Sequence, residues 1–183
     1  MKKFSMLLLL VMGLFVLSFN TSQAYSLDDI KKDYPKVKIK KETFKNDAGK
    51  NTTYRSIKLM QFGTSNPGLK LYFYLREKDF IHKWVVVHAS WYDYEWAFWN
   101  RITIGDGVNS YDIYPEDQPS RGMNGRFVGE NLYFNINDLK KWKLWNSAQQ
   151  IRIKGSKYYA DFNMPKQDVY QANMKIIYRY LWE

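Results

Sequence analysis

The strongest pattern in the chain runs from Ile81 to Ile104, a stretch that holds both histidines and four of the seven tryptophans. One set of alternate positions is apolar and the other is mixed. The apolar set is Val85, Val87, Ala89 and Trp91. A period of two in β-branched and aromatic residues predicts a long central strand whose apolar face lies in a core. The tail, from Trp96 to Ile104, is expected to turn and continue as a neighbouring strand.

Weaker alternation predicts further strands on both sides of this stretch. They cover residues 37–40, 53–62, 69–76, 111–114, 127–136, 151–154 and 158–162. The cleanest is 69–76, where four apolar residues from Leu69 to Leu75 face one way and Lys70, Tyr72, Tyr74 and Arg76 face the other. In 53–62, Ile57 and Leu59 are expected on one face. The segment 115–126 shows no periodicity and is predicted to be a long irregular loop.

Three segments have the signals of helices. Ser26 to Asp29 resembles a capping box that opens a short helix ending before Pro35. Asn137 or Asp138 can cap a second helix over 139–147. The last helix follows Pro165, and its apolar stripe is expected to pack on the sheet. The predicted fold is mainly β, on the border of α+β: an antiparallel β-sandwich or curved sheet of about eight strands with these three helices, and a barrel is also compatible.

The N-terminus has the pattern of a secretory signal peptide. Lys2 and Lys3 precede the apolar run 6–19, and small residues lead to a cleavage point after Ala24. The run is shorter than the roughly 20 residues that span a membrane. We therefore expect residues 1–24 to be a signal peptide and residues 25–183 to form one periplasmic or extracellular domain without a transmembrane segment.

Composition narrows the classes of partner and chemistry. The chain has no cysteine, which excludes disulfides, thiolate metal sites and a cysteine nucleophile. Its net charge of +10 predicts attraction to anionic partners, such as an acidic glycan, a lipid surface or an envelope polymer. Excess lysine that only maintains solubility is the alternative. Nucleic acid is not expected for an exported protein.

The sequence gives little support for a metal site or for a serine nucleophile with a histidine base. His82 and His88 stand six residues apart on one predicted strand, about 20 Å, which is too far for a shared metal ion. His88 and Ser90 are about 6.6 Å apart along the strand, beyond a nucleophile–base hydrogen bond. No G-x-S-x-G elbow is present. The sequence therefore predicts no metal and no cofactor.

Carboxylates give the alternative function. Asp93, Glu95, Asp106 and Glu116 are weak catalytic candidates, because two carboxyls about 5–9 Å apart beside aromatic rings form a glycosidase site. Asp112 and Asp117 belong to the same acidic region. Acids in turns commonly serve local hydrogen bonding instead. A carbohydrate-active hydrolase is thus the second hypothesis.

The leading candidate surface combines aromatic and basic side chains. Lys70, Tyr72, Tyr74 and Arg76 share one strand face, and Trp99 is a further candidate for ligand binding by ring stacking. These residues predict an exported, non-enzymatic binding protein of the bacterial cell envelope or extracellular space, with an anionic or glycan ligand. An inhibitor or toxin acting on a protein partner is a third hypothesis.

Overall fold

The chain folds into two antiparallel sheets and three helices in the computed structural model, which describes residues 25–45, 49–65, 68–78, 82–156 and 158–183. The predicted signal peptide, 1–24, lies outside the described residues. The prediction of a mainly β, curved antiparallel architecture with three helices is confirmed, with ten strands in place of about eight.

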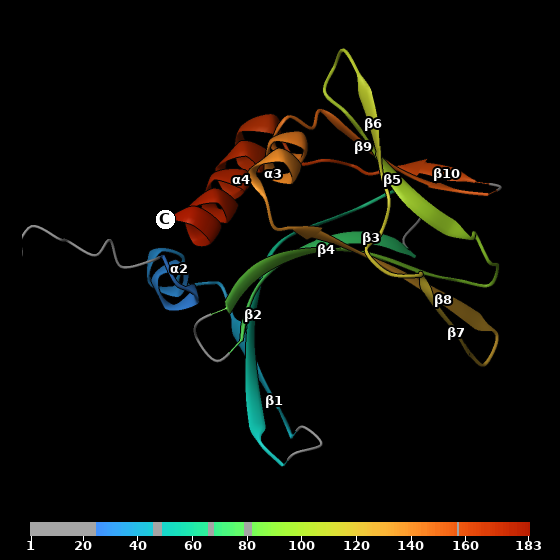
Figure 1. Cartoon of the computed structure of the whole chain (residues 1–183). Helices are drawn as coiled ribbons and strands as arrows, with labels where there is room; N and C mark the ends of the chain where they lie inside the picture. The colour runs from blue at the N-terminus through green and yellow to red at the C-terminus, as the bar shows by residue number, and fades with distance from the viewer. Residues whose placement is uncertain (1–24, 46–48, 66–67, 79–81, 157) are drawn as a thin grey trace, which may run out of the picture.

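Six strands form the large sheet, in the spatial order β1-β2-β3-β4-β8-β7. They are β1 (Ile39–Lys45), β2 (Asn51–Gly63), β3 (Leu69–Lys78), β4 (His82–Asp93), β8 (Phe127–Ile136) and β7 (Ser120–Asn124). The sheet curls into an arch, with β1 and β2 in one arm, β7 and β8 in the other, and β3 and β4 between them (Figure 1).

Four strands form the small sheet, in the order β10-β9-β5-β6. They are β10 (Tyr159–Asp161), β9 (Gln150–Gly155), β5 (Trp99–Gly105) and β6 (Ser110–Ile113). The small sheet lies over the β7–β8 side of the arch, whereas the helices lie over its other side (Figure 1). Both cover the convex face of the large sheet.

The core fills the space between the convex face of the large sheet and these coverings. The predicted apolar row of β4 is buried, and Val85 and Val87 have no exposed surface. The other elements contribute Leu71, Phe73, Leu75, Leu132, Phe134, Ile136, Ile102, Ile104, Ile151, Ile153, Trp145, Tyr170, Met174, Ile177 and Tyr180. Burying these side chains is the main favourable term in folding a chain that has no disulfide.

A β-bulge in β2 changes the predicted alternation of that strand. The register with β3 shifts between Lys58 and Met60. The core row therefore continues from Ile57 to Met60 and Phe62, while Leu59 is only partly buried. Leu59 packs against the core beside Ile57, as expected, but the extra residue at the bulge reverses the sides of the residues that follow, so Met60 and Phe62 continue the core row.

Two expectations were wrong about strand placement. The tail of the central stretch forms β5, but β5 pairs with β6 and β9 in the small sheet and is not a neighbour of β4. The predicted loop 115–126 contains β7, which makes a hairpin with β8. Polar and glycine residues in Ser120–Asn124 hide this strand, because both of its faces are exposed at a sheet edge.

The helices follow their predicted signals. Helix α2 (Leu27–Asp33) begins with a capping box between Ser26 and Asp29, and α3 (Leu139–Asn146) is capped by Asp138. Helix α4 (Gln167–Trp182) buries the stripe Tyr170, Met174, Ile176, Ile177 and Tyr180. Within the described part of the chain, no helix combines the length and apolar character needed to cross a membrane.

Candidate functional site

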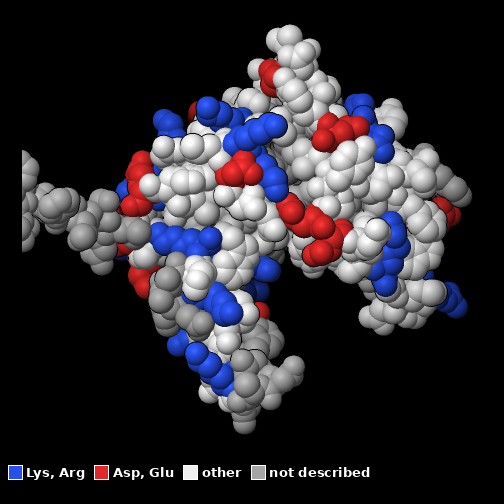
Figure 2. All heavy atoms as spheres, in the orientation of Figure 1, with Lys and Arg blue, Asp and Glu red and all other residues white. Residues whose placement is uncertain are grey.

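The concave face of the large sheet is the first candidate site. It lies opposite the core face and lines the inside of the arch, which Figure 2 shows as a hollow between the two arms. Strand register places side chains of β2, β3, β4 and β8 next to one another there. We define the concave face by Lys58, Lys70, Tyr72, Tyr74, Arg76, His88 and Tyr133.

Aromatic rings form a stacked row across this face. His88 stacks on Tyr133 with ring centroids 4.6 Å apart and on Tyr72 at 5.6 Å. Tyr72 in turn stacks on Tyr74 at 5.9 Å. Because the rings stack on one another, much of their faces is occupied within the row.

Three cations of β2 and β3 lie beside the row, and none of them has a carboxylate partner within the described ranges. The Lys58 ammonium lies 5.6 Å from the Tyr72 ring centre and donates to Gln61, and the Arg76 guanidinium lies 5.5 Å from the Tyr74 ring centre. Lys70 is exposed. Among the described residues, none of these three cations is within ion-pair distance of a carboxylate. Glu42 of β1 shares a shallow cavity of about 300 Å³ with Arg76 but makes no ion pair with it.

Burial changes the titration of the row. Desolvation lowers the pKa of His88 below its ordinary value, with the nearby Arg76 charge acting in the same direction, although a hydrogen bond to Asn131 opposes the shift. The His88 Nε2 lies 2.8 Å from the Asn131 Oδ1. Desolvation also raises the pKa of the Tyr74 hydroxyl. At neutral pH both groups are therefore uncharged, and the positive charge of this face comes from lysine and arginine.

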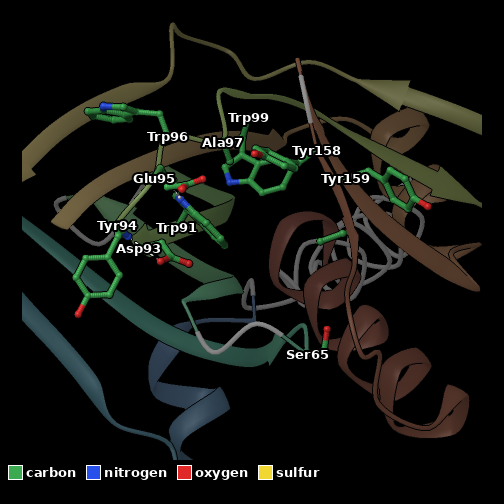
Figure 3. A pocket seen from close by; sticks show the side chains of 11 residues that line it. Ser65, Trp91, Asp93, Tyr94, Glu95, Trp96, Ala97, Trp99, Tyr158 and Tyr159 are labelled. Carbon is green, nitrogen blue, oxygen red and sulfur yellow. Dashed lines mark hydrogen bonds between the residues drawn. The ribbon is translucent and has the colours of Figure 1, made fainter. Parts of the chain in front are cut away.

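A cavity of about 550 Å³ at one end of the two sheets is the second candidate site. Its lining comes from the end of β4, the segment that leads into β5, and β10 with the residues before it (Figure 3). We call it the aromatic cavity. The side chains that matter most are Trp91, Asp93, Glu95, Trp99, Tyr158 and Tyr159.

Two tryptophans form the floor of the aromatic cavity. Trp91 and Trp99 meet edge to face, with centroids 5.6 Å apart and an interplanar angle of 81°. The Trp91 Nε1 donates to the Glu95 carbonyl at 3.0 Å. The Trp99 Nε1 is buried and has no hydrogen-bond partner among the described residues. An unpaired buried N–H costs about 1–3 kcal/mol, so the floor retains an unsatisfied donor.

Glu130 of β8 holds the backbone on which this floor is built. Its carboxylate accepts hydrogen bonds from the backbone N–H groups of Ala97 and Phe98 at 2.8 Å and of Trp99 at 3.1 Å. Arg121 of β7 adds a contact at 3.1 Å. Three successive N–H groups converging on one anion form a nest, and Phe98 has the left-handed φ of 54° that such a nest requires.

The structure separates the residues that the sequence proposed together. Lys70, Tyr72, Tyr74 and Arg76 do lie side by side on the concave face, whereas Trp99 is 2% exposed on the opposite side of the large sheet. The four acids also divide: Asp93 and Glu95 line the aromatic cavity, but Asp106 and Glu116 do not.

Asp106 and Glu116 both have local structural partners. Asp106 accepts from the N–H groups of Val108 and Asn109 in the β5–β6 turn, which lowers its pKa. Glu116 pairs with Lys141 of α3 at 2.7 Å. Two-carboxylate chemistry would therefore have to come from Asp93 and Glu95.

Several site residues could not be found from sequence alone. Tyr133 and Lys58 join the concave face only through strand register, and Tyr158 and Tyr159 reach the aromatic cavity because β10 folds back on β9. The alternation of side chains along their strands puts His88 and Tyr133 on the concave face, and this alternation is the one feature of the sequence that indicates it. Comparison with protein-family models, curated proteins and solved structures gave no match.

Proposed function

We propose that this chain is an exported, non-enzymatic binding protein that holds an anionic polymer, such as an acidic glycan of the cell envelope, against the concave face. The observation that carries the proposal is the presence of Lys58, Lys70 and Arg76 around a stacked aromatic row without carboxylate partners among the described residues. Export rests on the signal-peptide pattern of residues 1–24.

Lys58 and Arg76 of this face contact aromatic rings and an amide, in contrast to the described basic residues that pair with acids. Elsewhere in the described chain, Arg55, Arg101, Arg121, Lys141, Arg152, Lys154 and Arg179 each lie within 4.0 Å of an acidic group. On the concave face the cations instead contact rings and Gln61. An anion placed between them would supply the missing counter-charge, while the tyrosine hydroxyls can donate hydrogen bonds to it.

The shape of the site favours an extended ligand. The arch leaves a hollow open along the sheet, and its cations come from β2 and β3 while the ring row continues through β4 to β8. A chain of repeated anionic units can contact several of these groups at once. Binding is therefore expected to weaken with salt, because exposed charges are screened beyond about 8–10 Å at physiological ionic strength.

Two triple variants with equal charge loss test the proposal. The first is Lys58→Gln, Lys70→Gln and Arg76→Gln on the concave face. The second, the control, is Lys140→Gln, Lys143→Gln and Lys175→Gln on α3 and α4, where all three lysines are exposed. Circular dichroism and thermal melts check that both variants fold.

Retention is measured on immobilised heparin, polygalacturonate, a glycerol-phosphate polymer and phosphatidylglycerol vesicles, at about 50 mM and about 500 mM NaCl. The concave-face variant should bind its best polymer at least about tenfold more weakly, and the control should stay within about twofold of wild type. Equal losses in both variants would show that net charge alone drives retention, and no loss in either would reject the concave face as the site.

A further inference from the structure

We propose that the aromatic cavity is a second binding site, and that it takes an organic cation, an alkylammonium group of the kind found in choline. The aromatic cavity is lined by Trp and Tyr rings together with the carboxylates Asp93 and Glu95. This site is distinct from the concave face, and its ligand has the opposite charge. The two proposed sites are independent of each other.

Charge is the first reason for choosing a cation. The whole chain is strongly basic, yet no lysine or arginine is among the described residues that line the aromatic cavity. Its two carboxylates lie on either side of Trp91 in Figure 3. A negative, partly water-excluded recess in a basic protein concentrates cations and repels the anions that the rest of the surface attracts.

Ring geometry is the second reason. Trp91 and Trp99 meet at 81°, so they form a corner rather than a flat platform. A sugar ring stacks best on a flat exposed ring face, whereas an alkylammonium group gains from several ring faces that surround it. The Tyr159 ring lies on the outer face of the small sheet, beside Lys154, and points away from this corner in Figure 3. Tyr158, which also lines the aromatic cavity, is 50% exposed and is the ring available as an outer wall.

The Tyr159 ring already has a cation against it. The Arg152 guanidinium lies 4.6 Å from the Tyr159 ring centre, and Arg152 also forms a two-bond pair with Asp161. Arg152 does not line the aromatic cavity. Arg152 therefore occupies one face of this ring on the outer side of the small sheet, and the Tyr159 ring is not part of the proposed cation site.

The unpaired N–H of the Trp99 indole is the third reason for the proposal, and it indicates that the ligand also carries a hydrogen-bond acceptor. The Trp99 Nε1 is buried and has no partner among the described residues, and Figure 3 shows it on the side of the indole that faces Glu95. An acceptor atom in the ligand would satisfy it after a small movement of the exposed Glu95 side chain. An ammonium group that carries a hydroxyl or ester oxygen two carbons away has both features.

The first experiment titrates choline chloride into the purified protein while tryptophan fluorescence and binding heat are recorded. The neutral isostere 3,3-dimethyl-1-butanol is titrated in parallel, because it has the same shape without the charge. Choline should bind at least about tenfold more tightly than the isostere, since cation–ring attraction requires the charge. Equal affinity for the two compounds would overturn the proposal, as would the absence of any choline signal up to about 50 mM, beyond the range of specific small-ligand binding.

The second experiment compares charge-matched variants. Asp93→Asn with Glu95→Gln should weaken choline binding by about fivefold or more, because both carboxylates adjoin the cation. Glu116→Gln with Asp117→Asn removes the same charge outside the aromatic cavity and should change binding less than twofold. Tyr158→Ala tests the ring wall against Tyr114→Ala, which removes an exposed ring outside the aromatic cavity.

Two outcomes distinguish this proposal from the others. The Lys58, Lys70 and Arg76 triple variant should keep its choline affinity, so that failure of the polymer assay leaves the cation site intact. Binding of neutral sugars in place of choline, or cleavage of a glycan that is lost in the Asp93→Asn and Glu95→Gln variant, would reject the cation assignment and favour the hydrolase hypothesis.

Discussion

Glu130→Gln should destabilise the fold more than any other conservative change of a single carboxylate whose contacts are described above. The Glu130 side chain is fully buried, and its two oxygens accept three backbone N–H groups and the Arg121 guanidinium. Glutamine keeps the shape, so no cavity is created. Its NH₂ group, however, would face the Trp99 N–H and the Arg121 Nε–H, and donor would meet donor.

The expected cost is about 3–5 kcal/mol, the usual penalty for breaking one side of a buried charge pair. For a domain of this size that corresponds to a fall in Tm of roughly 6–20 °C. Thermal melts and urea unfolding, followed by far-UV circular dichroism, measure it. Near-UV circular dichroism should also change, because the nest positions Trp99.

Glu116→Gln is the matched control. The Glu116–Lys141 pair has a similar distance, 2.7 Å, but its side chains are more than a third exposed. Such surface pairs contribute about 0–1 kcal/mol. If Glu130→Gln lowers Tm no more than Glu116→Gln does, the convergence of N–H groups on Glu130 does not anchor the two sheets.

Three further predictions follow from particular contacts. Gly155→Ala should lower stability by about 1–3 kcal/mol in urea unfolding, because the new Cβ would lie 2.4 Å from the Ala97 carbonyl oxygen, whereas Gly122→Ala meets nothing within 4 Å and should be near neutral. A hydrogen bond from Thr103, aided by the charges of Lys154 and Arg101, holds the pKa of Asp112 below its usual range. The ionised Asp112 therefore contributes stability that is present above about pH 4 and is lost as pH falls through the folded pKa. Melts across that range should therefore show Asp112→Asn less stable than wild type at neutral pH and equal to it in acid. The His88 ring should titrate by NMR below its ordinary 6.5, and a value at or above 6.5 would contradict its burial in the stacked row.

Local patterns predicted the strands and helices well where one face is buried. In β3 and β4 the alternation is regular because one side meets the core and the other meets water. The capping box at Ser26 and the cap at Asp138 are short-range signals, so sequence alone was enough to find them. The bulge at Lys58 and the edge strand β7 escaped because neither leaves an apolar row of its own.

Assignment of strands to sheets was beyond local patterns. The residues after β4 were expected to continue beside it, but β5 lies in the other sheet. At its start, Glu130, more than thirty residues away in sequence, accepts hydrogen bonds from the backbone at 97–99. Trp99 is one of the residues that Glu130 holds, and it lies apart from the other predicted ligand-binding residues. A single buried carboxylate in an apolar strand pattern, Glu130 between Val128 and Leu132, was the signal that could have been read.

Strand β4 contributes side chains to both proposed sites, because its successive side chains point to opposite faces of the large sheet. His88 faces the concave face, while Trp91 and Asp93 face the aromatic cavity, so neighbouring positions on one strand serve surfaces of opposite charge. Because successive side chains of a strand point to opposite faces of the sheet, a cation bound at Asp93 and an anion bound near Arg76 would lie on opposite sides of the large sheet. Binding at one site therefore need not block the other. Titrating choline into the protein saturated with its anionic polymer should therefore give an affinity within about twofold of that for the free protein, and a larger change would show that the two sites are coupled.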